Sequence, residues 1–108
     1  GYTKGSAALI LALRAAARHY RVEDSLVAEW NHSIPGLAER SIGTARGSAR
    51  KAWRFEGEML EIAKTLSDAG LPAGFHQAAA EIFGRLGLFK DRSDASLGEV
   101  MDALVMGG

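Results

Sequence analysis

GYTKGSAALILALRAAARHYRVEDSLVAEW, residues 1–30, is the stretch that decides the fold. Four large apolar side chains point in several directions around one helix here: Leu9, Ile10, Leu11 and Leu13. Alanines fill much of the rest of this helix. A helix that is apolar nearly all round is covered by protein on most sides. A chain of 108 residues has little material for such a cover. We therefore expect part of a larger protein, cut near or inside this helix, or a module that buries the helix against a partner.

The composition indicates one globular domain of balanced charge. Hydrophobic residues make up 47% of the chain and charged residues 24%, which excludes a disordered segment. The 13 basic and 13 acidic residues cancel, which argues against a general nucleic-acid or membrane-surface binder. The apolar run Ala7–Leu13 is too short to span a bilayer. The absence of cysteine excludes disulfides and thiolate chemistry and fits a reducing compartment, so we expect a cytoplasmic protein.

The residue pattern predicts an all-α fold. Pro35 and Pro72 each stand where a helix would begin, because proline fits the first helical turn, and no alternating strand pattern occurs. Gly70 is expected to end a helix, Ser93 or Asp94 to cap the last one, and residues 107–108 to fray. The six predicted helices are about Thr3–Tyr20, Glu23–His32, Pro35–Gly47, Arg50–Ala69, Pro72–Leu86 and Ser96–Met106.

Two predicted helices carry apolar stripes that identify the core. The stripe within residues 50–69 is Ala52, Phe55, Met59, Ile62, Leu66 and Ala69, and that within residues 72–86 is Phe75, Ala78, Ala79, Ile82, Phe83 and Leu86. On the polar side of the predicted helix at residues 50–69, Arg54 and Glu58 are four residues apart and are expected to pair. Facing each other over residues 3–20, the two stripes would form a small helical bundle.

A basic cluster offers one candidate site. It contains no acidic residue and consists of Arg40, Arg46, Arg50, Lys51 and Arg54. One interpretation is an anion pocket, in which Lys51, Arg54 and the backbone amides of a helix beginning near residue 50 hold a phosphate or carboxylate. The other is a solvated surface whose charges are balanced by the glutamates that follow. Gly43 and Gly47 do not form a phosphate-loop signature.

The first helix offers a second candidate. Lys4, beside Thr3 on the first turn, is costly there unless an anion or carboxylate meets it, or it lies at an exposed helix start. The histidines, His19, His32 and His76, lie on three predicted helices without the i, i+4 spacing of a metal site. No nucleophile elbow or dinucleotide fingerprint occurs either. The residues therefore contain no complete catalytic set.

Four segments, in this order, resemble a known domain: GYTKGSAAL, PGLAERS, KAWRFEGEMLEIA and GLPAGFHQAAAEIF. They are similar to the C-terminal domain of a branch of the β-hydroxyacid dehydrogenases, which are NAD(P)-dependent enzymes related to 6-phosphogluconate and 3-hydroxyisobutyrate dehydrogenases. This domain is often described only as one of unknown function. The resemblance covers about residues 1–92, and residues 93–108, the extra C-terminal helix, have no counterpart in it.

The resemblance implies a division of labour between two domains. In this family an N-terminal Rossmann domain holds NAD or NADP, and a long helix links it to an all-helical domain that shapes the substrate pocket and usually forms a homodimer. The Rossmann domain and the catalytic lysine would lie upstream of Gly1. Residues 1–108 would then be a single all-helical domain that has no catalytic residue and binds no cofactor or metal alone.

The same resemblance places four residues near the substrate and cofactor: Thr3, Lys4, Lys51 and Arg54. Lys51 matches the family's second lysine, although Ala52 and Trp53 follow it where an aspartate and a leucine usually stand. The expected function is that of a substrate-binding and dimerisation domain, inactive alone, of an oxidoreductase that transfers hydride from a small anionic β-hydroxyacid. The alternative is a stand-alone helical protein-interaction or dimerisation module.

Overall fold

The computed structural model describes residues 2–106, and these form five α-helices and one short 3-10 helix without any strand. The predicted all-α class is therefore confirmed, while the expected fraying of residues 107–108 lies outside the described residues. None of the helices is long and apolar enough to cross a membrane. The elements are α1 (Tyr2–His19), α2 (Glu23–Ser33), α3 (Leu37–Asp68), α4 (Gly74–Gly84), η1 (Gly87–Phe89) and α5 (Leu97–Val105).

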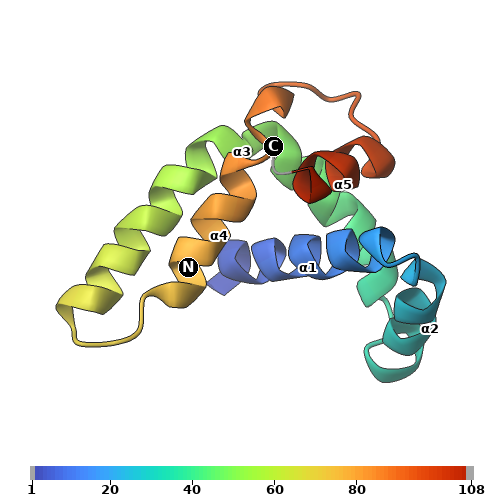
Figure 1. The fold of residues 1–108 in the computed structure, drawn as a ribbon, viewed down its shortest axis with the longest axis horizontal. Helices are drawn as coiled ribbons and strands as arrows, with labels where there is room; N and C mark the ends of the chain where they lie inside the picture. Colours follow the sequence, from blue (N-terminus) through green and yellow to red (C-terminus); the bar gives the residue numbers. More distant parts are fainter. Residues whose placement is uncertain (1, 107–108) are drawn as a thin grey trace.

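Helix α3 is one continuous helix, and the predicted separation into two helices at Gly47 is wrong. Its 32 residues would span about 48 Å if straight, which exceeds the 40 Å length of the molecule. Figure 1 shows that α3 instead changes direction in its middle, in the green part of the ribbon. The Gly47–Ser48 pair, a combination at which helices commonly bend, lies in this part of the chain. The glycine therefore permits a bend without ending the helix.

Two helices end in the same way, with a residue at positive φ. Gly70 follows α3 at φ 78°, and Leu71 N–H donates to the Leu66 carbonyl oxygen at 2.8 Å, which confirms the predicted stop at Gly70. After α1 the same position is occupied by Arg21 at φ 59°, with Val22 N–H donating to the Ala17 carbonyl oxygen. A side chain at this φ is strained, so the turn after α1 is the less favourable of the two.

Helix α5 begins with a capping box in which Ser96 Oγ accepts from Glu99 N–H and the Glu99 carboxylate accepts from Ser96 N–H. The predicted caps, Ser93 and Asp94, are therefore wrong by two or three residues. Asp94 instead accepts a hydrogen bond from Arg92 Nε at 3.1 Å. This bond, together with a backbone hydrogen bond and the guanidinium charge, lowers the pKa of Asp94 from its usual 3.8.

The core lies where the second half of α3 packs against α4 and both contact α1, as the two apolar stripes predicted. Phe83 of α4 is fully buried and meets Phe55 of α3 edge to face, with the ring centres 5.4 Å apart. The C-terminal elements complete this core, and Figure 1 shows α5 lying beside α1. The residues that they bury are Phe89, Val100, Met101 and Leu104.

Part of the predicted apolar surface remains outside the core. Phe75, placed on the buried stripe by its spacing, is 83% exposed, and Ala69 and Ala78 are exposed as well. Phe75 lies on the first turn of α4, on the side that borders a groove rather than α3. On α1, Leu9 and Leu13 are exposed although Leu11 is fully buried. The described residues therefore cover most of the apolar first helix and leave a stripe through Leu9 and Leu13 exposed.

Candidate functional site

The first candidate site is built around the Phe55 ring, where α1 meets α3. The Lys4 ammonium forms an ion pair and hydrogen bond with the Glu58 carboxylate. It also lies 4.6 Å from the centre of the Phe55 ring. The sequence left open whether Lys4 lies at an exposed helix start or meets a carboxylate, and the structure shows a half-buried Lys4 with Glu58 as that carboxylate.

Arg54 lies beside the same ring, with its guanidinium carbon 5.9 Å from the ring centre. The predicted Arg54–Glu58 pair is wrong, because Glu58 is paired with Lys4. Within residues 2–106, no carboxylate lies at ion-pair distance from Arg54 or Lys51. We call Lys4, Lys51, Arg54, Phe55 and Glu58 the Phe55 cluster.

The expected anion pocket at a helix start near residue 50 is wrong in its backbone part. Lys51 and Arg54 lie in the middle of the continuous helix α3, where the amides are used within the helix. Only side chains are therefore available to an anion at this place. Both side chains are exposed, and so is Thr3 on the first turn of α1. The structure brings Lys4 and Arg54 to one ring, with Lys51 one turn before Phe55 on α3.

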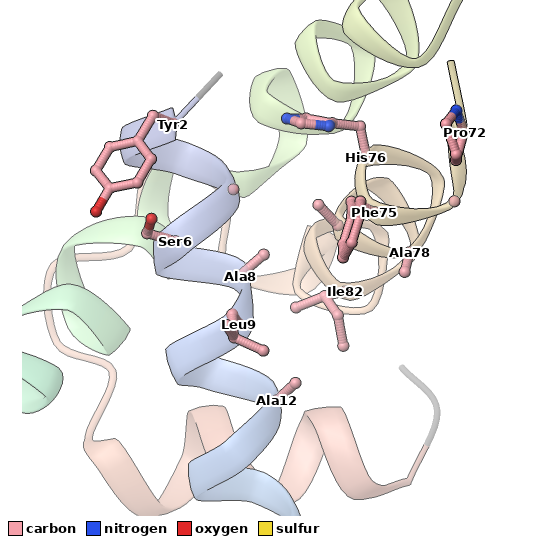
Figure 2. Close-up of a pocket in the computed structure, with 13 residues that line it drawn as sticks. Tyr2, Ser6, Ala8, Leu9, Ala12, Pro72, Phe75, His76, Ala78 and Ile82 are labelled. Atoms are coloured by element: carbon pink, nitrogen blue, oxygen red, sulfur yellow. The ribbon is translucent and has the colours of Figure 1, made fainter. Parts of the chain in front are cut away.

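The second candidate site is an apolar groove of about 600 Å³ between α1 and the start of α4, which we call the α1–α4 groove. Figure 2 shows Ala8, Leu9 and Ala12 of α1 directed toward Phe75 and Ile82 of α4. The lining contains no aspartate, glutamate, lysine or arginine. The groove therefore suits an apolar, uncharged occupant, whereas the cationic side chains of the first candidate site lie in the Phe55 cluster.

His76 is the one imidazole on the groove, among the described residues, and its ring points toward the first turn of α1 (Figure 2). The ring lies against Gly5: a Cβ added there would be 3.4 Å from His76 Nε2. Both ring nitrogens are buried, and neither has a hydrogen-bond partner. A neutral imidazole carries one N–H donor and one acceptor, so His76 is a polar group left unsatisfied in an apolar wall.

The chain matches the model of a family described as a domain of unknown function, DUF1932, over residues 17–86. The match covers most of the described helices. The chain belongs to the DUF1932 family. The matched part holds four members of the Phe55 cluster and His76, whereas Thr3 and Lys4 precede it. No curated protein and no solved structure matches the chain.

Two arginines of this DUF1932 protein link helices of the fold. Arg14 is buried, and its Nη1 donates to Ser41 Oγ at 3.0 Å, joining α1 to α3. Arg18 joins α1 to α5 through Asp102, Nε to Oδ1 at 2.8 Å. In the part of the chain that the structure describes, no three histidine, cysteine or acidic side chains converge to hold a metal ion.

The two tryptophans of this DUF1932 domain differ in role. Trp30 is buried, whereas Trp53 is exposed on α3 and stacks beneath the Lys90 ammonium, 4.5 Å from the ring. The groove itself was not predicted from the sequence. Its signal was available in the small residues Gly5, Ala8 and Ala12, which recur on one side of α1. Spacing alone did not show that α4 leaves this side open.

Proposed function

We propose that this domain is the substrate-binding and dimerisation domain of an NAD(P)-dependent oxidoreductase that acts on a small anionic β-hydroxyacid. Its fold would then be that of the 6-phosphogluconate dehydrogenase C-terminal domain, and the protein would act in the cytoplasm. The observation that carries the proposal is that Lys4 and Arg54 both lie beside the Phe55 ring. The family resemblance placed both residues near the substrate, and they come from distant parts of the chain.

The chemistry of the Phe55 cluster supports an anionic substrate. A carboxylate held by lysine and arginine forms short, charge-assisted hydrogen bonds, and the guanidinium can hold both carboxylate oxygens. Arg54 and Lys51 have no carboxylate partner within the described residues, and Lys4 has Glu58. We propose that the substrate carboxylate binds Arg54 and Lys51 and competes with Glu58 for Lys4, so that its reacting carbon is held in a fixed position.

The described residues do not fit a nicotinamide dinucleotide. The α1–α4 groove has no charged side chain for the diphosphate. The Phe55 cluster combines Lys4 of α1 with residues of the continuous helix α3 and contains no glycine-rich phosphate turn. We therefore derive no step through a cofactor in this domain. The proposal assigns cofactor binding and the catalytic lysine to a separate domain encoded upstream of Gly1.

The coding sequence upstream of Gly1 tests this proposal. We expect a strand, a Gly-x-Gly-x-x-Gly turn and a helix roughly 150 or more residues before Gly1. The protein that includes this part should reduce NAD or NADP with a β-hydroxyacid, and residues 1–108 alone should show no turnover. A start codon or an unrelated domain immediately upstream would overturn the assignment.

The α1–α4 groove favours the second candidate, a helical protein-interaction module without an attached enzyme. Apolar surface exposed on one helix face is typical of a protein–protein contact and needs no catalytic group. The upstream sequence separates the two candidates, because the module requires no dinucleotide-binding unit there. Anion binding separates them too, since only the oxidoreductase domain needs Arg54 and Lys51 to hold a carboxylate.

A further inference from the structure

The lining of the α1–α4 groove changes in character along its length. Its polar side chains, Tyr2, Ser6 and His76, lie at one end, on the first two turns of α1 and the first turn of α4. The other side chains of the lining are apolar, and Figure 2 shows Ala12 and Ile82 at the opposite end. The lined part of α1 runs from its first residue to Ala12 and is therefore about 15 Å long. The groove thus has a short polar end and a longer apolar part.

His76 is the polar group of this end that lacks a partner. Both of its ring nitrogens are buried without a hydrogen bond, and the ring lies against Gly5. Because no hydrogen bond holds the ring in place, a turn about the Cα–Cβ bond of His76 breaks none, and it can bring a ring nitrogen to the groove. A molecule in the groove that supplies a hydrogen-bonding partner removes the cost of the unsatisfied imidazole.

We infer that the α1–α4 groove binds an uncharged small molecule that is apolar along most of its length and carries a hydroxyl or carbonyl group at one end, hydrogen-bonded to His76. The volume of about 600 Å³ falls within the range of small-molecule sites, roughly 300–1,000 Å³. The inference does not depend on the proposed oxidoreductase function, because the groove and the Phe55 cluster are lined by different side chains.

The lining argues against the other occupants. Within residues 2–106 it carries no charged side chain, so a carboxylate or an ammonium group would lose its hydration there without gaining an ion pair. A wholly apolar occupant, such as a hydrocarbon or the apolar face of a partner helix, would leave His76 unsatisfied. A molecule with one uncharged polar group matches both the polar end and the apolar part of the groove.

Titration of the isotope-labelled chain with octan-1-ol, followed by amide NMR spectra, tests the inference. We expect saturable shifts at Gly5, Ala8 and Ala12, with a dissociation constant of about 1 mM or lower. The ring nitrogens of His76 should shift in the same titration, because one of them gains a hydrogen bond. Octanoate and octylamine, which have the same chain length but carry a charge, should bind severalfold more weakly.

Two variants examine the apolar part of the groove. Leu9→Lys should raise the dissociation constant of octan-1-ol at least about tenfold, because it places a charge on the lining. Leu60→Lys is the matched control: Leu60 is 52% exposed on α3, outside the lining, and Leu9 is 60% exposed, so neither change disturbs the core. The control should leave the dissociation constant unchanged.

His76→Leu examines the polar end with a side chain of similar size. It should weaken octan-1-ol about three- to tenfold, because the hydrogen bond is lost, and should leave 1-chlorooctane, which has no hydroxyl, unchanged. Equal losses for the two ligands would overturn the role of His76. Absence of saturable binding, shifts away from the lining, or octanoate binding as tightly as octan-1-ol would overturn the inference as a whole. Turnover by the longer protein tests the proposed function separately.

Discussion

Lys4, on the first turn of α1, is ion-paired with Glu58 in the second half of α3, and the Lys4 ammonium also lies over the Phe55 ring. This pair fixes the beginning of α1 to the helix that carries Lys51 and Arg54. Both side chains are partly exposed, so the pair adds little to stability. The pair matters instead for ligand binding: while Glu58 is bound to the Lys4 ammonium, a ligand carboxylate has to compete with Glu58 for it.

Replacing Glu58 by glutamine should release Lys4. We expect Glu58→Gln to lower the free energy of unfolding by less than about 1 kcal/mol, since the pair is partly solvated. Affinity for a small carboxylate such as 3-hydroxybutyrate should rise severalfold, as measured by calorimetric titration. Asp68→Asn is the matched control, because it removes a carboxylate from the exposed Lys64–Asp68 pair of the same helix. Equal affinities in the two variants would show that Glu58 does not compete for Lys4.

Lys51 and Arg54 should affect catalysis without affecting stability. In the longer protein that includes the cofactor domain, Lys51→Ala and Arg54→Ala should each lower kcat/KM at least about tenfold, because each removes a charge-assisted contact to the substrate. The melting temperature should change little, since both side chains are exposed. Lys64→Ala, at an exposed lysine on the same helix, is the control. Unchanged kinetics in both variants would make this part of α3 an ordinary solvated surface.

Phe83 and Phe75 test which side of α4 supports the fold. Phe83→Ala should lower the free energy of unfolding by about 3–5 kcal/mol, because the ring is fully buried against Phe55. Phe75→Ala should change it by no more than about 0.5 kcal/mol, measured by urea denaturation at a concentration at which the chain is monomeric. Similar losses in the two variants would mean that Phe75 is part of the monomer core.

The two positive-φ turns predict opposite effects of substitution. Gly70→Ala should destabilise the chain by about 1 kcal/mol, because the alanine is strained at φ 78°. Arg21→Gly should stabilise it by up to about 1 kcal/mol, because it relieves the same strain after α1. Nothing lies within 4 Å of a Cβ added at Gly70, so a loss there reflects backbone strain alone. Thermal unfolding measures both, and shifts of the same sign would contradict the shared geometry.

Replacing His76 by an apolar residue should increase the stability of the chain. Replacing this unsatisfied imidazole with an apolar side chain of similar size, His76→Leu, should raise the free energy of unfolding by about 1 kcal/mol, because a buried donor without a partner is removed. His32→Leu, at an exposed position on α2, should change it by less than about 0.5 kcal/mol. Denaturant titration measures both, and a loss on His76→Leu would mean that the imidazole makes a stabilising contact.

The sequence predicted the all-α class and the main packing because these depend on local periodicity. The two predicted stripes, one through Met59 and one through Phe83, describe real buried faces. The prediction failed at Gly47, where glycine propensity favoured a break. Contacts that join α1 to both halves of α3, Arg14 to Ser41 and Lys4 to Glu58, are not visible in local propensity. The prediction also failed at Phe75, since spacing along one helix does not show how far a neighbouring helix covers it.

The candidate site was predictable only residue by residue. The position of Lys4 on an apolar helix suggested a carboxylate partner. Nothing in the spacing identified Glu58 as that partner, because the contact depends on how α1 crosses α3. The basic cluster was visible in the sequence, yet its backbone amides proved unavailable once α3 was continuous. The α1–α4 groove arises from two helices packing at one end, and a one-dimensional pattern does not contain that angle.

The boundaries of sequence similarity and of the folded unit differ in this chain. The DUF1932 match spans residues 17–86, yet Leu11 before it and Phe89, Met101 and Leu104 after it are buried in the same core. Arg18, just inside the match, is held by Asp102, outside it. A fragment trimmed to residues 17–86 would thus lose two walls of its interior and should aggregate or collapse loosely. The segments outside the family match therefore shield the core from water, and a version of this domain made for expression should include them.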